Sequence, residues 1–113
     1  MKRVLLDENL DWRLKNYFSS EFDVTSVPDL GWQSKKNGEL LTAMEIERIE
    51  YLVTADRNLR FQQNLDKYRL VIVVIRSFDI RLKNLINFIP TIESAISNAG
   101  STEKIIEIEL RHD

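Results

Sequence analysis

The chain has 113 residues, of which 43% are hydrophobic and 30% charged, and it contains no cysteine. This length and hydrophobic content fit one globular domain, so we treat residues 1–113 as a single domain. The 16 basic and 18 acidic residues give a formal net charge of -2, so nucleic-acid binding would need a local basic patch or a metal ion. The lack of cysteine excludes disulfides, thiolate metal sites and a cysteine nucleophile.

The sequence shows no targeting or membrane-spanning signal. The N-terminal segment MKRVLLDENL becomes acidic after a few apolar residues, which makes it too short for a signal peptide. No stretch approaches the roughly 20 apolar residues that cross a bilayer. We therefore expect a cytoplasmic protein that does not interact with a membrane.

The first half of the chain predicts two strands and two helices. A short apolar run over residues 2–7 is typical of a strand buried on both faces. Apolar residues recur at helical spacing over 10–18. Residues 21–27 alternate as in a strand, and a turn over 28–31 ends it. The polar residues 34–38 precede a second helix.

The second half predicts three more strands. Residues 51–54 form a short apolar strand, residues 59–66 are weakly helical, and residues 70–75 are the clearest buried strand of the chain. Residues 82–96 have helical periodicity, with a bend expected at Pro90. Residues 104–110 alternate as in a half-exposed edge strand.

Strands that alternate with helices imply right-handed βαβ units. The sequence therefore predicts an α/β fold with a mostly parallel central sheet covered by helices on both faces, which is a three-layer α/β/α sandwich. In such a sheet the functional site lies beyond the carboxyl ends of the strands, where the strand order reverses.

Acidic residues fall at such positions. Asp7 and Asp56 each follow a predicted strand, and Glu39 lies at the start of the second helix. Carboxylates are the ligands that Mg²⁺ and Mn²⁺ prefer, and a bound metal can activate water for phosphodiester hydrolysis. We therefore predict a metal site with these three acids as ligands and catalytic residues. Its oxygen-bearing supporting neighbours would be Glu8, Asn9, Asn37 and Asn58.

Each of these residues also has a structural interpretation. Asp7, Glu8 or Asn9 could cap the first helix, and Glu39 could stabilise the first turn of the second. Four basic residues near the same rim could contact phosphate or simply be solvated; they are Lys35, Lys36, Arg57 and Arg60. Trp12 and Trp32 are expected to pack in the core or at the rim rather than to stack on bases.

Several other chemistries are disfavoured. His112 is the one histidine and lies next to the last residue, which argues against Ser–His catalysis and histidine-bound zinc. The three glycines form neither a P-loop nor a dinucleotide-binding motif.

The motifs of residues 1–75 resemble, in order and spacing, those of the short bacterial PIN-like proteins, a family related to VapC-type toxin nucleases. The shared features are the strand end Leu-Asp-Glu-Asn (residues 6–9), the Asp-x-Gly turn (29–31), the acidic helix start (37–41) and the Val-Thr-x-Asp strand end (53–56). The chain departs from the family where Asn37 replaces the usual Asp and where Asn58-Leu59 replaces Asp-Phe.

This resemblance implies a PIN-like fold with a Mg²⁺ or Mn²⁺ site formed by Asp7, Glu39 and Asp56, with Glu8 matching the family's opening motif. It also implies ribonuclease activity in a toxin–antitoxin system, with RNA as substrate and an antitoxin protein as partner. A homodimer is also compatible with these expectations. Because Asn carries no charge, Asn37 and Asn58 would weaken metal binding, so activity could be attenuated.

Two other functions stay open at this stage. A catalytically inactive PIN-like interaction module is favoured by Asn37 and Asn58. A receiver-like phosphoacceptor domain would also carry acids after its first and third strands, and Ser77 would match its hydroxyl residue. The receiver reading is weakened because neither Pro28 nor Pro90 follows a lysine.

Overall fold

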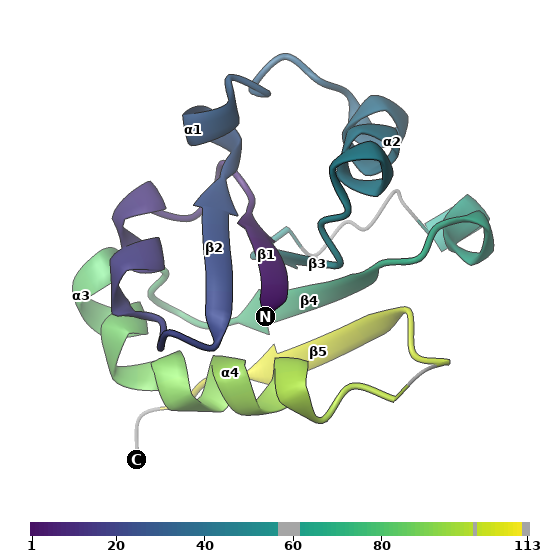
Figure 1. Cartoon of the computed structure of the whole chain (residues 1–113). Helices are drawn as coiled ribbons and strands as arrows, with labels where there is room; N and C mark the ends of the chain where they lie inside the picture. The colour runs from purple at the N-terminus through teal and green to yellow at the C-terminus, as the bar shows by residue number, and fades with distance from the viewer. Residues whose placement is uncertain (57–61, 101, 112–113) are drawn as a thin grey trace.

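The computed structural model describes residues 1–56, 62–100 and 102–111. These residues form one five-stranded sheet in the order β2-β1-β3-β4-β5, in which every neighbouring pair is parallel (Figure 1). The strands are β1 (Lys2–Leu6), β2 (Phe22–Ser26), β3 (Tyr51–Thr54), β4 (Val71–Arg76) and β5 (Ile105–Glu109). The predicted α/β fold is confirmed, and the sheet is wholly rather than mostly parallel.

The helical segments are shorter and more divided than the sequence pattern predicted. They are η1 (Trp12–Tyr17), α1 (Val27–Leu30), α2 (Asn37–Glu47), η2 (Gln62–Lys67), α3 (Leu82–Leu85), η3 (Ile86–Phe88) and α4 (Ile89–Ser97), where η marks a 3-10 helix. The helix expected over residues 10–18 is thus a short 3-10 helix. The expected break near Pro90 falls at Phe88, because proline offers no N–H and its ring clashes with a carbonyl one turn earlier.

Both faces of the sheet are buried, because neighbouring residues of a strand point to opposite sides. On one side Leu52 packs in a cluster with Leu41 and Met44 of α2. On the other side Val53 packs in a cluster that includes Leu14 of η1 and Ile92 of α4. The helices therefore cover both faces, which explains the near-continuous apolar runs of the strands.

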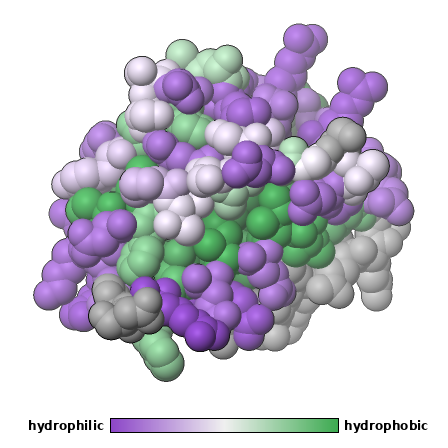
Figure 2. All heavy atoms as spheres, turned by 90° about the horizontal axis from the view of Figure 1, so that it is seen from below, coloured by the Kyte–Doolittle hydropathy of each residue, from purple (hydrophilic) through white to green (hydrophobic). Residues whose placement is uncertain are grey.

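The strand β5 forms one edge of the sheet, as its alternating pattern predicted. Ile105 and Ile106 are only partly buried, whereas Glu107 and Glu109 are exposed. Figure 2 views the molecule from below, the side of α4 and β5 in Figure 1, and shows hydrophobic residues reaching the surface among hydrophilic ones. None of the described helices has the length and apolar character needed to cross a membrane.

The strand order reverses at β1. The chain passes from β1 to its neighbour β2 on one side, and then returns to place β3 on the other side of β1. In parallel sheets of this kind, ligands bind beyond the carboxyl ends of the strands that flank such a reversal. The carboxyl ends of β1 and β3 are therefore the place to look for a functional site.

Candidate functional site

Asp7 and Asp56 lie at the carboxyl ends of these two adjacent strands. Leu6 of β1 is paired with Val53 of β3, and the Asp7 backbone N–H donates a 2.9 Å hydrogen bond to the Val53 carbonyl. Asp56 follows the last residue of β3 by two positions. Asp7 and Asp56 thus follow the ends of neighbouring parallel strands, as expected, although 49 positions separate them in the sequence.

The Thr54 hydroxyl joins these segments. It donates a 2.7 Å hydrogen bond to Asp7 Oδ2 and accepts hydrogen bonds from Asn9 Nδ2 (3.2 Å) and from the Asp56 backbone N–H (3.1 Å). Thr54 is fully buried. A hydroxyl has one donor and two acceptor positions, so all of its capacity is used to fix the two strand ends.

The remaining bonds hold the loop after β1 in place. Asp7 Oδ1 accepts a 2.9 Å hydrogen bond from the Glu8 backbone N–H, and Asn9 Oδ1 accepts a 3.2 Å bond from the Ala55 N–H. The Asp7 carboxylate is half-buried, whereas Asp56, Glu8 and Asn9 are exposed. One carboxylate is therefore oriented by two donors, and the second lies at the water-facing rim.

Glu39 does not join these two acids. Its Oε1 accepts a 3.2 Å hydrogen bond from the Lys36 backbone N–H, so it caps the N-terminus of α2. Within residues 1–56, 62–100 and 102–111 there is no group of three acidic or histidine side chains that could hold a metal ion. In this structure Glu39 therefore occupies the capping position rather than the place of a third metal ligand.

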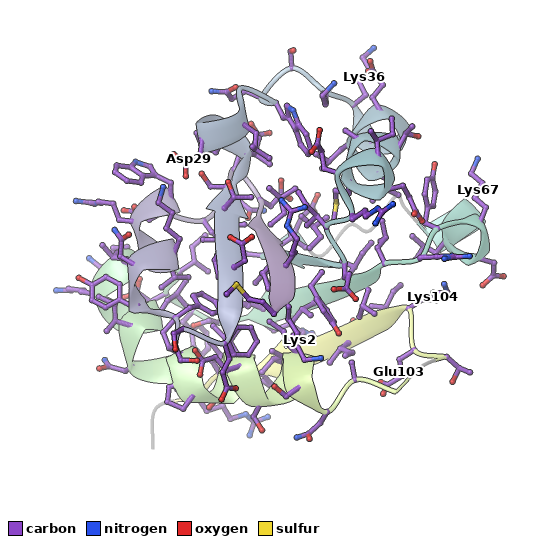
Figure 3. The ribbon with its side chains drawn as sticks, in the orientation of Figure 1. Lys2, Asp29, Lys36, Lys67, Glu103 and Lys104 are labelled. Atoms are coloured by element: carbon purple, nitrogen blue, oxygen red, sulfur yellow. The ribbon has the colours of Figure 1, made fainter. Side chains whose placement is uncertain are left out.

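The predicted basic and supporting residues have varied positions. Asn37 is the exposed first residue of α2. The Lys35 ammonium lies 5.8 Å from the centre of the Trp32 ring, and Lys36, labelled in Figure 3, is an exposed residue at the start of α2. Three residues fall outside the part of the chain that the structure describes: Arg57, Asn58 and Arg60.

The Asp-x-Gly turn ties two helical segments together. Asp29 Oδ2 accepts hydrogen bonds from Lys15 Nζ (2.5 Å) and from the Ser26 hydroxyl (2.7 Å), and Ser26 caps α1. The Lys15 and Ser26 bonds hold the pKa of the Asp29 carboxyl below its ordinary value. Gly31 ends α1 in the left-handed region, with φ of 70°. This motif is therefore a structural connection between η1 and α1 (Figure 3).

The donor set at the rim fits a hard divalent cation. Mg²⁺ is commonly bound by one or two carboxylates together with water and substrate phosphate, and Asp7 and Asp56 offer two carboxylates beside the amide oxygen of Asn9. Thr54 was not among the predicted site residues, although it belongs to the Val-Thr-x-Asp motif. Its role depends on the pairing of β1 with β3, which the sequence alone does not display.

The comparisons with known proteins identify no relative: no protein-family model, curated protein or solved structure matches the chain. The geometry of the site and the sequence motifs therefore carry the functional argument.

Proposed function

We propose that this protein is a Mg²⁺- or Mn²⁺-dependent phosphodiester hydrolase with a PIN-like fold, acting as an endoribonuclease. The observation that supports it best is the placement of Asp7 and Asp56 at the strand-order reversal, joined through Thr54. Two carboxylates with water are enough for a Mg²⁺ ion whose coordination shell the substrate phosphate completes. The toxin–antitoxin role, an antitoxin partner and a homodimer are part of this proposal and rest on the motif resemblance.

In this proposal the protein supplies metal-binding carboxylates in fixed positions, and none of its side chains acts as a general acid or base. Asp7 would be the principal ligand, since the Thr54 hydroxyl and the Glu8 N–H orient its carboxylate before any ion binds. Asp56 would be the second ligand, at the exposed rim where substrate enters. Asp7 and Asp56 would hold the ion, which when bound would supply activated water and offset the charge that develops on the phosphate. Because two carboxylates bind Mg²⁺ weakly, metal and RNA should bind in a mutually dependent way.

The second candidate is a catalytically inactive PIN-like interaction module. The observation that favours it is the capping role of Glu39, which leaves no three-carboxylate group among the described residues. The receiver-like reading is less well supported. The Ser77 hydroxyl is engaged in a turn, where it donates to the Asp79 carbonyl (3.1 Å) and accepts from the Asp79 N–H (3.2 Å).

The nuclease proposal is tested with a pool of structured and unstructured RNAs. Wild type, Asp7→Asn and Glu39→Gln should be purified in parallel and assayed with Mg²⁺, with Mn²⁺ and with EDTA. We expect slow cleavage in Mg²⁺ and faster cleavage in Mn²⁺ by wild type and Glu39→Gln, and none by Asp7→Asn or in EDTA. Equal cleavage by wild type and Asp7→Asn would identify a contaminating ribonuclease. Absence of metal-dependent cleavage by wild type would favour the interaction module.

A further inference from the structure

A groove of about 640 Å³ lies beside the candidate metal site. Asn9, which bonds to Thr54, is one of the residues that line it. Its walls come from the start of η1 and the start of α3, which contact each other and lie on the same side of the molecule in Figure 1. The charged side chains that line it are Asp11, Arg13, Arg81 and Lys83. The groove therefore joins the strand-end rim to a surface with several cationic groups.

Two Asp-x-Arg pairs of nearly identical geometry stand at this groove. In the first, Arg13 Nε and Nη2 donate to the two Asp11 oxygens at 3.0 and 2.7 Å, and the Arg13 N–H donates to Oδ1 at 2.9 Å. In the second, Arg81 Nε and Nη2 donate to Asp79 at 2.8 and 2.7 Å, and its N–H donates at 2.9 Å. Each aspartate thus fixes its arginine in one orientation.

The fixed arginines keep hydrogen-bonding capacity toward solvent. A guanidinium has five N–H donors, and two are used on the aspartate in each pair. The arginine side chains are 56% and 71% exposed, whereas the aspartates are 25% and 26% exposed. With Lys83, the two pairs carry three positive against two negative charges, although the whole chain has a net charge of -2. The groove is therefore a locally cationic surface with preoriented donors.

In the sequence, an exposed aromatic residue lies next to the aspartate of each pair. Trp12 stands between Asp11 and Arg13 and is 46% exposed, and Phe78 directly precedes Asp79 and is fully exposed. The Lys15 ammonium lies 5.1 Å from the centre of the Trp12 ring. Proteins that bind single-stranded nucleic acid combine a cationic groove with aromatic side chains on which bases stack. Trp12 and Phe78 do not line the groove itself, but they lie close in sequence to the two arginines and are exposed.

We infer that this groove binds the backbone of a single-stranded nucleic acid, with Arg13, Arg81 and Lys83 on phosphates and with Trp12 and Phe78 stacking on bases. The inference deepens the proposed function, on which it rests, by naming how the strand reaches Asp7 and Asp56. A local structural role would explain the two aspartates, since each accepts the backbone N–H of the residue two positions later. Such a role requires neither the exposed guanidinium groups nor a fully exposed phenylalanine.

The test of the phosphate contacts is binding measured without catalysis. Fluorescence anisotropy with labelled single-stranded RNA and DNA oligonucleotides is recorded in EDTA over a range of salt concentrations. Three phosphate contacts to a single strand predict that log K falls against log salt with a slope of about -2. The variant Arg13→Gln/Arg81→Gln/Lys83→Gln should bind at least about tenfold more weakly, with a slope near zero. Lys67→Gln/Arg69→Gln, which removes two positive charges elsewhere, is the control, since Lys67 lies on η2, away from α3 (Figure 3). It should bind as wild type.

The test of stacking uses two exposed apolar residues. Phe78→Ala should weaken binding by about fivefold or more, since stacking on one base carries about 1–3 kcal/mol. Ile46→Ala on α2, where the isoleucine is 73% exposed, should leave binding unchanged. Circular dichroism and thermal melting of every variant separate lost binding from lost folding.

The outcomes for the groove and for the metal site are distinguishable. Wild-type binding of the oligonucleotide in EDTA, lost in the groove variants, would support the groove even if no metal-dependent cleavage is found. The inference is overturned if folded wild type binds neither RNA nor DNA, or if the triple variant binds as tightly as wild type. It is also overturned if the control variants lose as much affinity as the groove variants.

Discussion

The Thr54 hydroxyl donates a 2.7 Å hydrogen bond to the Asp7 carboxylate across the junction of β3 and β1. The same oxygen accepts bonds from Asn9 and from the Asp56 N–H. One buried side chain therefore sets the positions of both candidate metal ligands, and changes at Thr54 should affect stability and metal binding together.

Replacing Thr54 by valine keeps the shape of the side chain but removes the hydroxyl. We expect Thr54→Val to lower the free energy of unfolding by about 1 kcal/mol, because three partly buried hydrogen bonds are lost. Urea denaturation measures the difference. Thr25→Val on β2, outside this network, is the control and should change stability little. Unchanged stability of Thr54→Val would show that the network contributes nothing.

Asp7 and Asp56 should respond differently to loss of charge. Asp7→Asn should cost about 1–2 kcal/mol of unfolding free energy, because an amide has one acceptor oxygen for the Thr54 and Glu8 donors and loses the charge-assisted bonds. Asp56→Asn should cost less than Asp7→Asn, because Asp56 is exposed whereas Asp7 is half-buried. Denaturant titration without divalent ions makes the comparison. Greater stability of Asp7→Asn than of wild type would indicate that repulsion between the carboxylates outweighs these bonds.

Stability should depend on pH through Asp29. Its pKa is held below the ordinary value of 3.8 by the bonds from Lys15 and Ser26. A carboxyl whose pKa is lower in the folded state contributes its full stabilisation above about pH 4, the range of the unfolded-state pKa. That contribution to the free energy of unfolding is lost as the pH falls through the pKa of the folded state. The stability difference between wild type and Asp29→Asn should therefore be largest near neutral pH and shrink below pH 4. Urea melts at pH 7, 5 and 3 measure it, and a difference that is constant with pH would contradict the assignment.

Arg48 ends α2 in the left-handed region, with φ of 58°. A side chain at this position is strained, and glycine relieves the strain. Arg48→Gly should raise the free energy of unfolding by up to about 1 kcal/mol, whereas Arg48→Ala should not, since alanine keeps its Cβ. Thermal and urea unfolding of the two variants test this. A stability loss in Arg48→Gly would mean that the arginine side chain makes a stabilising contribution larger than the backbone strain.

Much of the fold could be predicted because the buried strands have a recognisable sequence pattern. A parallel strand buried on both faces needs a continuous apolar run, so residues 70–75 and 51–54 could be placed within a residue or two of β4 and β3. Helical segments were harder to define. The periodicity of residues 82–96 is continuous, yet backbone geometry near Pro90 divides it into three pieces.

The site was predictable where it depends on topology. The shared location of Asp7 and Asp56 could be predicted from the sequence, because the carboxyl ends of parallel strands lie at the same edge of the sheet. Glu39 could not be assigned in this way, since an acid at a helix start suits a cap as well as a metal ligand, and the structure shows the cap. The network of Thr54 and the groove between η1 and α3 depend on side-chain contacts between distant segments.

The most direct test of the account is Mn²⁺ binding measured by isothermal titration calorimetry on wild type, Asp7→Asn, Asp56→Asn and Glu39→Gln. We expect wild type and Glu39→Gln to bind one Mn²⁺ with similar affinity, because Glu39 caps α2. Asp7→Asn and Asp56→Asn should each bind at least about tenfold more weakly, since a charged ligand is lost. Failure of wild type to bind Mn²⁺ in the presence or absence of RNA, or equal binding by Asp7→Asn, would contradict the metal site and with it the proposed nuclease.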